Sequence, residues 1–209
     1  RFASEGKCVA RQDGFVIFVS GVVPGDTARV RIEKVKRNFA EGIPTSIVNP
    51  SPLRTTPPCK YFGTCGGCTW QHVQYEAQLT LKRQNVIDAF ERIGGFEQVE
   101  VVPTLPSSEI YYYRNKIEFS FSRQRWLPDD EFAVGASSEE AFALGFHHPR
   151  RYDKVLDVDA CFLQSEVSNE ILQTVKEFCR GKKIEVYDSE TQSGYLRFLV
   201  IREGKNTGE

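Results

Sequence analysis

The sequence predicts an α+β protein in two parts: an N-terminal OB-like β-barrel over residues 1–49, and a central antiparallel-sheet domain with two helices and a cysteine loop over residues 50–209. Three observations support this prediction. Short alternating segments separated by glycine turns fill the N-terminal stretch. Prolines crowd between residues 50 and 58, as in a linker. The remainder mixes alternating segments with two stretches of helical periodicity.

The N-terminal stretch reads as short strands joined by tight turns. Residues 15–19 are rich in β-branched and aromatic side chains, and residues 27–35 alternate between apolar and charged side chains. Gln12-Asp13-Gly14 and Pro24-Gly25-Asp26 supply the turns. Short, evenly spaced strands are typical of a small barrel. A five-stranded barrel would need one more strand before Arg1, so we expect the natural chain to begin earlier.

Two helices are predicted in the second part. The first runs from residue 75 to 93 and is followed by Gly94-Gly95, a typical helix stop. The second begins at Ser165 as N-cap and ends at Gly181. Their apolar stripes are Tyr75, Leu79, Val86, Phe90 and Ile93 in the first helix, and Val167, Ile171, Leu172 and Val175 in the second. Strands are expected at 111–121, 141–147, 154–158, 184–187 and 196–201, with an acidic surface excursion at 127–140.

Composition limits the class of protein. The net charge is −1, which argues against a general nucleic-acid-coating protein and directs attention to local basic patches. No apolar run approaches the length of a membrane span, and no signal peptide is recognisable. Six cysteines are too few for a secreted disulfide scaffold. We therefore expect a cytoplasmic protein with no membrane partner.

The cysteines point to a metal site. Cys59, Cys65 and Cys68 have the spacing C-x5-C-x2-C and lie among Gly63, Gly66 and Gly67. Two cysteines separated by two residues can bind one metal ion or adjacent irons of a cluster, and glycines let backbone N–H groups approach the sulfur atoms. Cys8 and Cys179 lie within regular elements and are expected in the core.

The spacing alone leaves two metals open. Cys59, Cys65 and Cys68 with His72 would form a tetrahedral Cys3His zinc site. Alternatively, the remote Cys161 would complete an all-cysteine iron–sulfur site. Cys161 tilts the balance towards iron–sulfur, because an all-cysteine site needs a fourth thiolate. It follows a predicted strand that would bring it to a sheet edge. Either metal would be structural, with its binding linked to folding.

Taken together, these motifs resemble a known family. Residues 5–26 look like a TRAM domain, an OB-like RNA-binding module. The run from Cys59 to Trp70-Gln71-His72 is similar to the iron–sulfur loop of the bacterial 23S rRNA (uracil-5-)-methyltransferases. Further matches are Tyr113-Arg114-Asn115-Lys116, Leu144-Gly145-Phe146-His147, and Asp157-Val158 followed by Cys161. The resemblance covers nearly the whole chain.

The resemblance implies a cofactor, a methyl donor and a mechanism. It implies that Cys59, Cys65, Cys68 and Cys161 bind a [4Fe–4S] cluster, with His72 outside the ligand set. It implies S-adenosylmethionine as donor, and a cysteine thiolate that adds to C6 of a flipped uracil before C5 is methylated. In this family the nucleophile, the base and the donor-binding domain lie C-terminal. We therefore expect no catalytic residues before Glu209, a central domain that continues beyond it, and no activity from this chain alone.

Two basic segments are candidate RNA contacts. Lys34, Lys36 and Arg37 lie in the densest basic run, and Arg114, Asn115 and Lys116 follow three tyrosines. Basic side chains beside aromatic rings are typical of proteins that bind unpaired RNA. The resemblance favours 23S rRNA over tRNA as substrate, and a monomer. Two rival hypotheses are a zinc-stabilised RNA-binding adaptor without catalysis and an electron carrier with a redox cluster.

Overall fold

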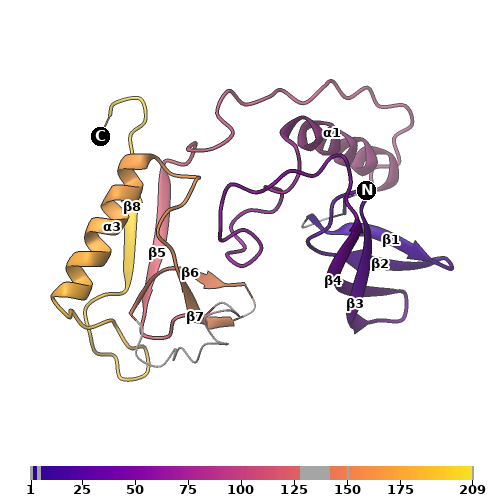
Figure 1. The fold of residues 1–209 in the computed structure, drawn as a ribbon. Helices are drawn as coiled ribbons and strands as arrows, with labels where there is room; N and C mark the ends of the chain where they lie inside the picture. Colours follow the sequence, from indigo (N-terminus) through magenta and orange to yellow (C-terminus); the bar gives the residue numbers. More distant parts are fainter. Residues whose placement is uncertain (1, 4–5, 128–141, 150, 209) are drawn as a thin grey trace. The chain divides into compact units, whose positions relative to one another are not determined.

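The computed structural model of the chain describes residues 2–3, 6–127, 142–149 and 151–208 (Figure 1). Within these ranges it contains two helices and two four-stranded sheets, which confirms the α+β class. The chain divides into two compact units, residues 1–63 with 68–108, and residues 64–67 with 109–209. The domain boundary at residues 49 and 50 stays a prediction. The acidic excursion predicted at 127–140 lies, apart from Leu127, outside the described residues.

The first unit carries an N-terminal sheet of strand order β1-β2-β4-β3. The strands are β1 (Cys8–Gln12), β2 (Phe15–Val19), β3 (Thr27–Val35) and β4 (Phe39–Asn49). A tight turn joins β1 to β2, with Asp13 at φ 51° and Gly14 at φ 81°, as antiparallel hairpins of this length require. β2 pairs with β4 in parallel, and β3 pairs with β4 antiparallel. No pairing between described residues joins β1 to β3, so the closed barrel stays a prediction.

Helix α1 (Tyr75–Arg92) is attached to this sheet by only part of its length. Its Ala77 is buried in the core of the unit, and Leu81 packs against that core. Farther along, the side chains of Val86, Phe90 and Ile93 are exposed. The predicted helix is confirmed, with the Gly94 N–H donating to the Ala89 carbonyl at its end. Its apolar stripe, however, is not buried along the second half. The core residues are Phe2, Cys8, Val19, Val22, Val23, Val73 and Ala77.

The second unit carries an antiparallel sheet of strand order β7-β6-β5-β8. The strands are β5 (Lys116–Ser122), β6 (Ala143–His148), β7 (Arg151–Asp157) and β8 (Phe198–Arg202). On β5 the side chains at 117, 119 and 121 are buried and those between them are not, as the alternation predicted. The strand expected at 184–187 forms only an isolated bridge between Val186 and Leu196. The chain turns soon after it, where the Asp188 carboxylate accepts the N–H groups of Glu190 and Thr191.

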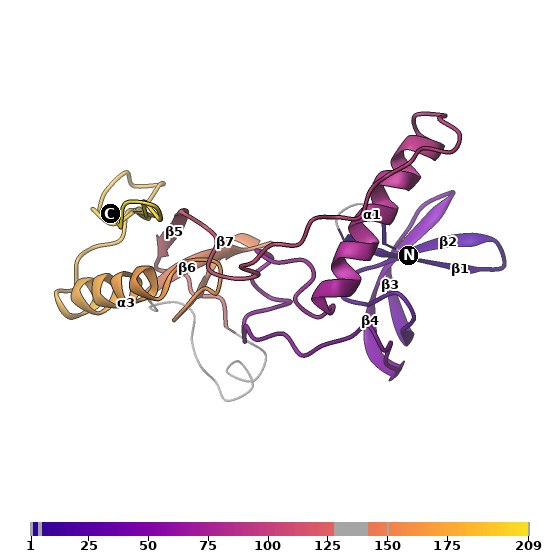
Figure 2. The same cartoon turned by 90° about the horizontal axis from the view of Figure 1, so that it is seen from above.

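Helix α3 (Glu166–Gly181) lies beside this sheet in both views (Figures 1 and 2). The Ser165 hydroxyl accepts the Ser168 N–H at 3.1 Å, which confirms the predicted N-cap. The predicted apolar stripe is wrong for two members, because Val167 and Ile171 are exposed. The buried face is instead Ser168, Leu172, Lys176 and Cys179. No helix in the described ranges has the length and apolarity needed to cross a bilayer.

Candidate functional site: the cysteine loop and the basic surfaces

The four predicted metal ligands are all half-buried cysteines. Cys59 and Cys68 group with the first unit, and Cys65 and Cys161 with the second. All six cysteines are among the described residues, and none forms a disulfide. No three His, Cys, Asp or Glu side chains in the described ranges are close enough together to hold a metal ion. The ligand set therefore stays a prediction. Cys8 and Cys179 are buried, as predicted.

The loop that carries three of these cysteines depends on glycine. Gly63 and Gly66 have φ values of +90° and +71°, a region that other residues rarely occupy. At Gly66 a Cβ atom would also lie 2.3 Å from Cγ of Pro149, at the tip of the β6–β7 hairpin. A side chain at Gly66 is therefore excluded by conformation and by space. At Gly63 no atom of the described residues lies within 4 Å of an added Cβ, so only the backbone conformation requires glycine there.

Cys59 sits in a locally ordered turn. Its N–H donates to the Gln71 side-chain oxygen at 3.3 Å, and its carbonyl accepts the Phe62 N–H at 3.1 Å. Burial raises the pKa of the Cys59 thiol, and the nearby Cys68 adds to this effect. A metal ion or cluster bound here would have to displace the thiol proton, so its affinity would increase with pH.

His72, the alternative zinc ligand, is buried with 4% of its surface exposed. Among the described residues, neither ring nitrogen has a partner at hydrogen-bonding geometry, and the ring packs against Phe62 with 5.0 Å between centroids. Burial lowers the pKa of His72, and the Arg54 guanidinium lowers it further, while the nearby Val22 backbone opposes the shift only in part. A neutral imidazole with unpaired nitrogens suits a metal ligand. His72 therefore fits the zinc alternative.

Cys161 is held through its backbone by helix α3. The Asn169 side chain accepts the Cys161 N–H at 2.8 Å and donates to its carbonyl at 3.2 Å. On the same face of α3, Lys176 donates to the Val158 carbonyl at 2.6 Å, and Gln173 donates to the Asp159 carbonyl. We call these three side chains, Asn169, Gln173 and Lys176, the α3 polar row. It fixes the backbone of residues 158–161, so the position of Cys161 is defined.

The side chain of Lys176 is almost fully buried, with 3% of its surface exposed, and its charge is compensated by a neighbouring carboxylate. Its Nζ lies 2.9 Å from the Asp157 carboxylate at the end of β7. That carboxylate also accepts the Leu144 N–H at 3.0 Å and lies 3.5 Å from the Arg180 guanidinium. A buried charge with this many partners avoids the large cost of isolation. The sequence did not predict that Lys176 is buried, because a lysine in an amphipathic helix is normally exposed.

The first predicted RNA segment is exposed and lies beside aromatic rings. Lys34, Lys36 and Arg37 are all exposed, at the end of β3 and in the turn after it. The Lys36 ammonium lies 5.3 Å from the centroid of the Phe39 ring. Phe39 in turn contacts Phe18 edge to face, with 5.4 Å between centroids. Basic and aromatic side chains thus adjoin here, as the sequence predicted.

The second predicted RNA segment is exposed too. The side chains of Arg114, Asn115 and Lys116 face solvent, as do Tyr112 and Tyr113. Asn115 and Lys116 line a groove of about 560 Å³ together with Arg202, Glu203 and Gly204. Arg202 was not among the predicted RNA residues. It adjoins Lys116 because the two are directly paired between β5 and β8, and strand pairing cannot be read from either segment alone.

Comparison with known proteins finds similarities for both parts of the chain. Residues 1–45 match the TRAM domain. Proteins named as uncharacterized RNA methyltransferases from Porphyromonas gingivalis and Bacteroides thetaiotaomicron are 44% and 40% identical, each over 99% of this chain. The chain is thus similar, over nearly its whole length, to proteins named RNA methyltransferases. It spans 45% of the length of each of these two relatives.

A solved structure supports the same relationship. The tRNA (uracil-54, C5)-methyltransferase of Pyrococcus abyssi, in complex with S-adenosyl-L-homocysteine, is 34% identical with a TM-score of 0.60. The match covers 99% of this chain and 45% of that one. The predicted resemblance to a TRAM domain and to RNA methyltransferases is thereby confirmed.

Proposed function

We propose that this chain is the RNA-binding part of an S-adenosylmethionine-dependent RNA uracil-C5 methyltransferase that acts on 23S rRNA. The observation that carries this proposal is the homology to RNA methyltransferases over nearly the whole chain, which includes the TRAM match. The uracil-C5 chemistry and the methyl donor are supported by the archaeal neighbour, whose structure contains the demethylated donor.

In the whole protein, the expected chemistry is transfer of a methyl group from sulfonium sulfur to uracil C5. A cysteine thiolate would add to C6, C5 would attack the methyl group, and a base would then remove the C5 proton so that the thiolate can leave. We propose that the nucleophile and the base lie beyond Glu209, in the part of the relatives that this chain does not cover. The role of the present residues is to bind and orient RNA.

Within this proposal, Cys59, Cys65, Cys68 and Cys161 hold a [4Fe–4S] cluster. The donor set fits the group chemically: four thiols outside any disulfide, three of them in a glycine-containing loop and the fourth fixed by the α3 polar row. The cluster would have a structural role, because it would link the cysteine loop to Cys161, and it would not need to perform redox chemistry.

Metal and sulfide analysis of anaerobically purified protein tests the ligand set. About four irons and four sulfides per chain are expected, and Cys161→Ser should lose them. The matched control is Cys179→Ala, a change at a buried core cysteine that should keep the iron. Zinc without sulfide, unaffected by Cys161→Ser and lost in His72→Gln, would contradict the cluster. It would support a zinc-stabilised RNA-binding module instead.

A second candidate substrate is tRNA, because the solved neighbour is a tRNA (uracil-54, C5)-methyltransferase. The two substrates are separated by supplying the whole protein with labelled methyl donor and either a 23S rRNA transcript or a tRNA transcript. We expect the labelled methyl group to be incorporated into the rRNA alone. Incorporation into the tRNA alone would show that tRNA, and not rRNA, is the substrate.

A further inference from the structure

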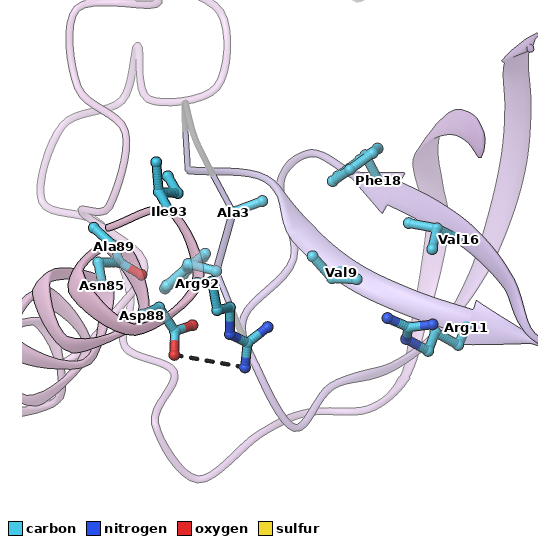
Figure 3. Close-up of a pocket in the computed structure, with 11 residues that line it drawn as sticks. Ala3, Val9, Arg11, Val16, Phe18, Asn85, Asp88, Ala89, Arg92 and Ile93 are labelled. Carbon is cyan, nitrogen blue, oxygen red and sulfur yellow. Dashed lines mark ion pairs between the residues drawn. The ribbon is translucent and has the colours of Figure 1, made fainter. Parts of the chain in front are cut away.

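The first unit contains a groove of about 500 Å³ between the β1–β2 hairpin and the C-terminal half of α1 (Figure 3). It was not among the predicted RNA contacts. It is lined by Phe2, Ala3, Val9, Arg11, Val16, Phe18, Asn85, Asp88, Ala89, Arg92 and Ile93. This volume is within the range of sites that hold small ligands.

The groove follows from how the helix is attached. α1 packs on the core through Ala77 and Leu81, and the groove begins at Asn85, where these contacts have ended. The opposite wall is one face of the hairpin, since Val9 pairs with Phe18 and Arg11 pairs with Val16 across the strands. These four side chains therefore point to the same side of the sheet. The C-terminal half of α1 does not pack against these four side chains, so they line an open groove.

The walls combine apolar surface with positive charge. Val9, Val16 and Phe18 are half-buried, whereas Arg11 is exposed. From the helix, Arg92 extends into the groove with 56% of its side chain exposed. Asp88 is the one acidic group among the described lining residues, and its carboxylate lies 3.6 Å from the Arg92 guanidinium, which offsets its charge. A flat apolar ring bordered by phosphates would be complementary to this arrangement.

The groove is also continuous with the basic segment already described. Phe18 contacts Phe39 edge to face, and Phe39 lies under the Lys36 ammonium. An RNA strand that follows Lys36 and Phe39 would thus reach Phe18 directly. The amide of Asn85 and the carboxylate of Asp88 could meet the polar edge of a base held there.

We propose that this groove binds one unpaired nucleotide of the RNA substrate, with the base against Phe18 and the flanking phosphates on Arg11 and Arg92. The proposal rests on the proposed function, because it takes RNA as the ligand, and it names where in the first unit an unpaired base is held. A duplex is excluded from the groove itself, since paired bases are not available to stack on Phe18.

Fluorescence anisotropy with a short fluorescein-labelled oligouridine tests the proposal on the full chain. Phe18→Leu keeps an apolar side chain but removes the ring, and should weaken binding roughly tenfold, as for loss of one stacked base. The control is Phe15→Leu, on the same strand and outside the groove, which should bind normally. Arg92→Gln should reduce the slope of log affinity against log salt by about 0.7, the value for one phosphate of a single strand. Lys82→Gln, an exposed change on the same helix, should not.

The outcomes separate this proposal from the broader function. Failure of the unaltered chain to bind any RNA would overturn both. Normal binding and slope in Phe18→Leu and Arg92→Gln would overturn the groove alone, and would suit a groove that docks protein. If Phe18→Leu does not fold, cross-linking of a 4-thiouridine-containing oligouridine to the unaltered chain decides. Attachment to the β1–β2 hairpin or α1 is expected, and attachment only elsewhere contradicts the proposal.

Discussion

Single side chains in the first unit connect segments that are far apart in sequence. The Asp26 carboxylate accepts the N–H groups of Val23 at 2.7 Å and Ser51 at 2.8 Å, and pairs with the Arg54 guanidinium at 2.7 Å. Its side chain is 1% exposed. Desolvation by itself would raise the pKa of Asp26, but the hydrogen bonds from Arg54, Val23 and Ser51 outweigh it and hold the pKa below its ordinary value of 3.8.

We expect Asp26→Ala to lower the free energy of unfolding by about 3 kcal/mol at pH 7, because it leaves Arg54 and two N–H groups without their partner. A carboxylate with a depressed pKa stabilises the fold above the unfolded pKa, and this stabilisation is lost as pH falls through the folded pKa. The difference between the two proteins should therefore shrink below pH 3.8. Denaturant unfolding at pH 7 and under acidic conditions measures it.

Asp153→Ala is the matched control for that change. Asp153 pairs with Arg151 at 2.7 Å, but both side chains are about half exposed. Exposed pairs add little to stability, so this variant should unfold like the unaltered chain at pH 7. Equal stabilities of all three proteins would show that the Asp26 network does not hold the turn at residues 23–26 to the segment that leads into the cysteine loop.

Among the secondary-structure elements, α3 gives the clearest test of how a helix positions a candidate ligand. Asn169→Ala removes the bonds to the N–H and carbonyl of Cys161 and the bond from the Gln164 side chain. We expect a loss of about 2 kcal/mol in stability, since each such bond contributes about 1 kcal/mol and the site is partly exposed. If the protein binds the proposed cluster, the variant should also release iron faster than the unaltered protein on exposure to a chelator.

Glu170→Ala, one residue along α3 and exposed, is the control for both measurements. Thermal unfolding and iron release are to be followed on the same samples. A variant at Asn169 that melts earlier but retains iron normally would make the α3 polar row a feature of folding alone. Loss of iron at an unchanged melting temperature would show that the α3 polar row serves to position Cys161.

The helices show what the sequence could predict and why the rest needed the structure. Helical periodicity and the Ser165 cap are local signals, so both helices were found with nearly correct ends. Burial is not local. Phe90 and Ile93 share the apolar stripe with Leu79, yet they are exposed because the helix leaves the sheet. Lys176 was missed for the converse reason, since its burial depends on a carboxylate from β7.

The candidate site divides in the same way. The spacing of Cys59, Cys65 and Cys68 was visible in the sequence because the three lie within one loop. The basic segments were also visible and proved to be exposed. The pairing of Arg202 with Lys116 and the groove at Phe18 were not, because each requires strands and a helix to come together. The distant partner Cys161 was supplied by a family resemblance rather than by spacing.

At the scale of the whole molecule, RNA binding should draw on both compact units. Arg37 belongs to the first unit and Arg114 to the second, and both are exposed. We expect Arg37→Glu and Arg114→Glu each to weaken binding of a 23S rRNA fragment and to flatten its salt dependence, by about one phosphate contact per variant. The control is Lys82→Glu, which makes the same charge change at an exposed position of α1.

The double variant Arg37→Glu/Arg114→Glu distinguishes RNA binding by both units from RNA binding by only one unit. If both units hold the same RNA molecule, each contributes to a single affinity, and the double variant should bind more weakly than either single variant. If only one unit binds RNA, one single variant should match the double variant and the other should match the control. Unchanged affinity and salt slope in all three would place the RNA surface away from both basic segments. Because each unit carries basic side chains next to exposed or half-buried aromatic rings, we expect the first outcome.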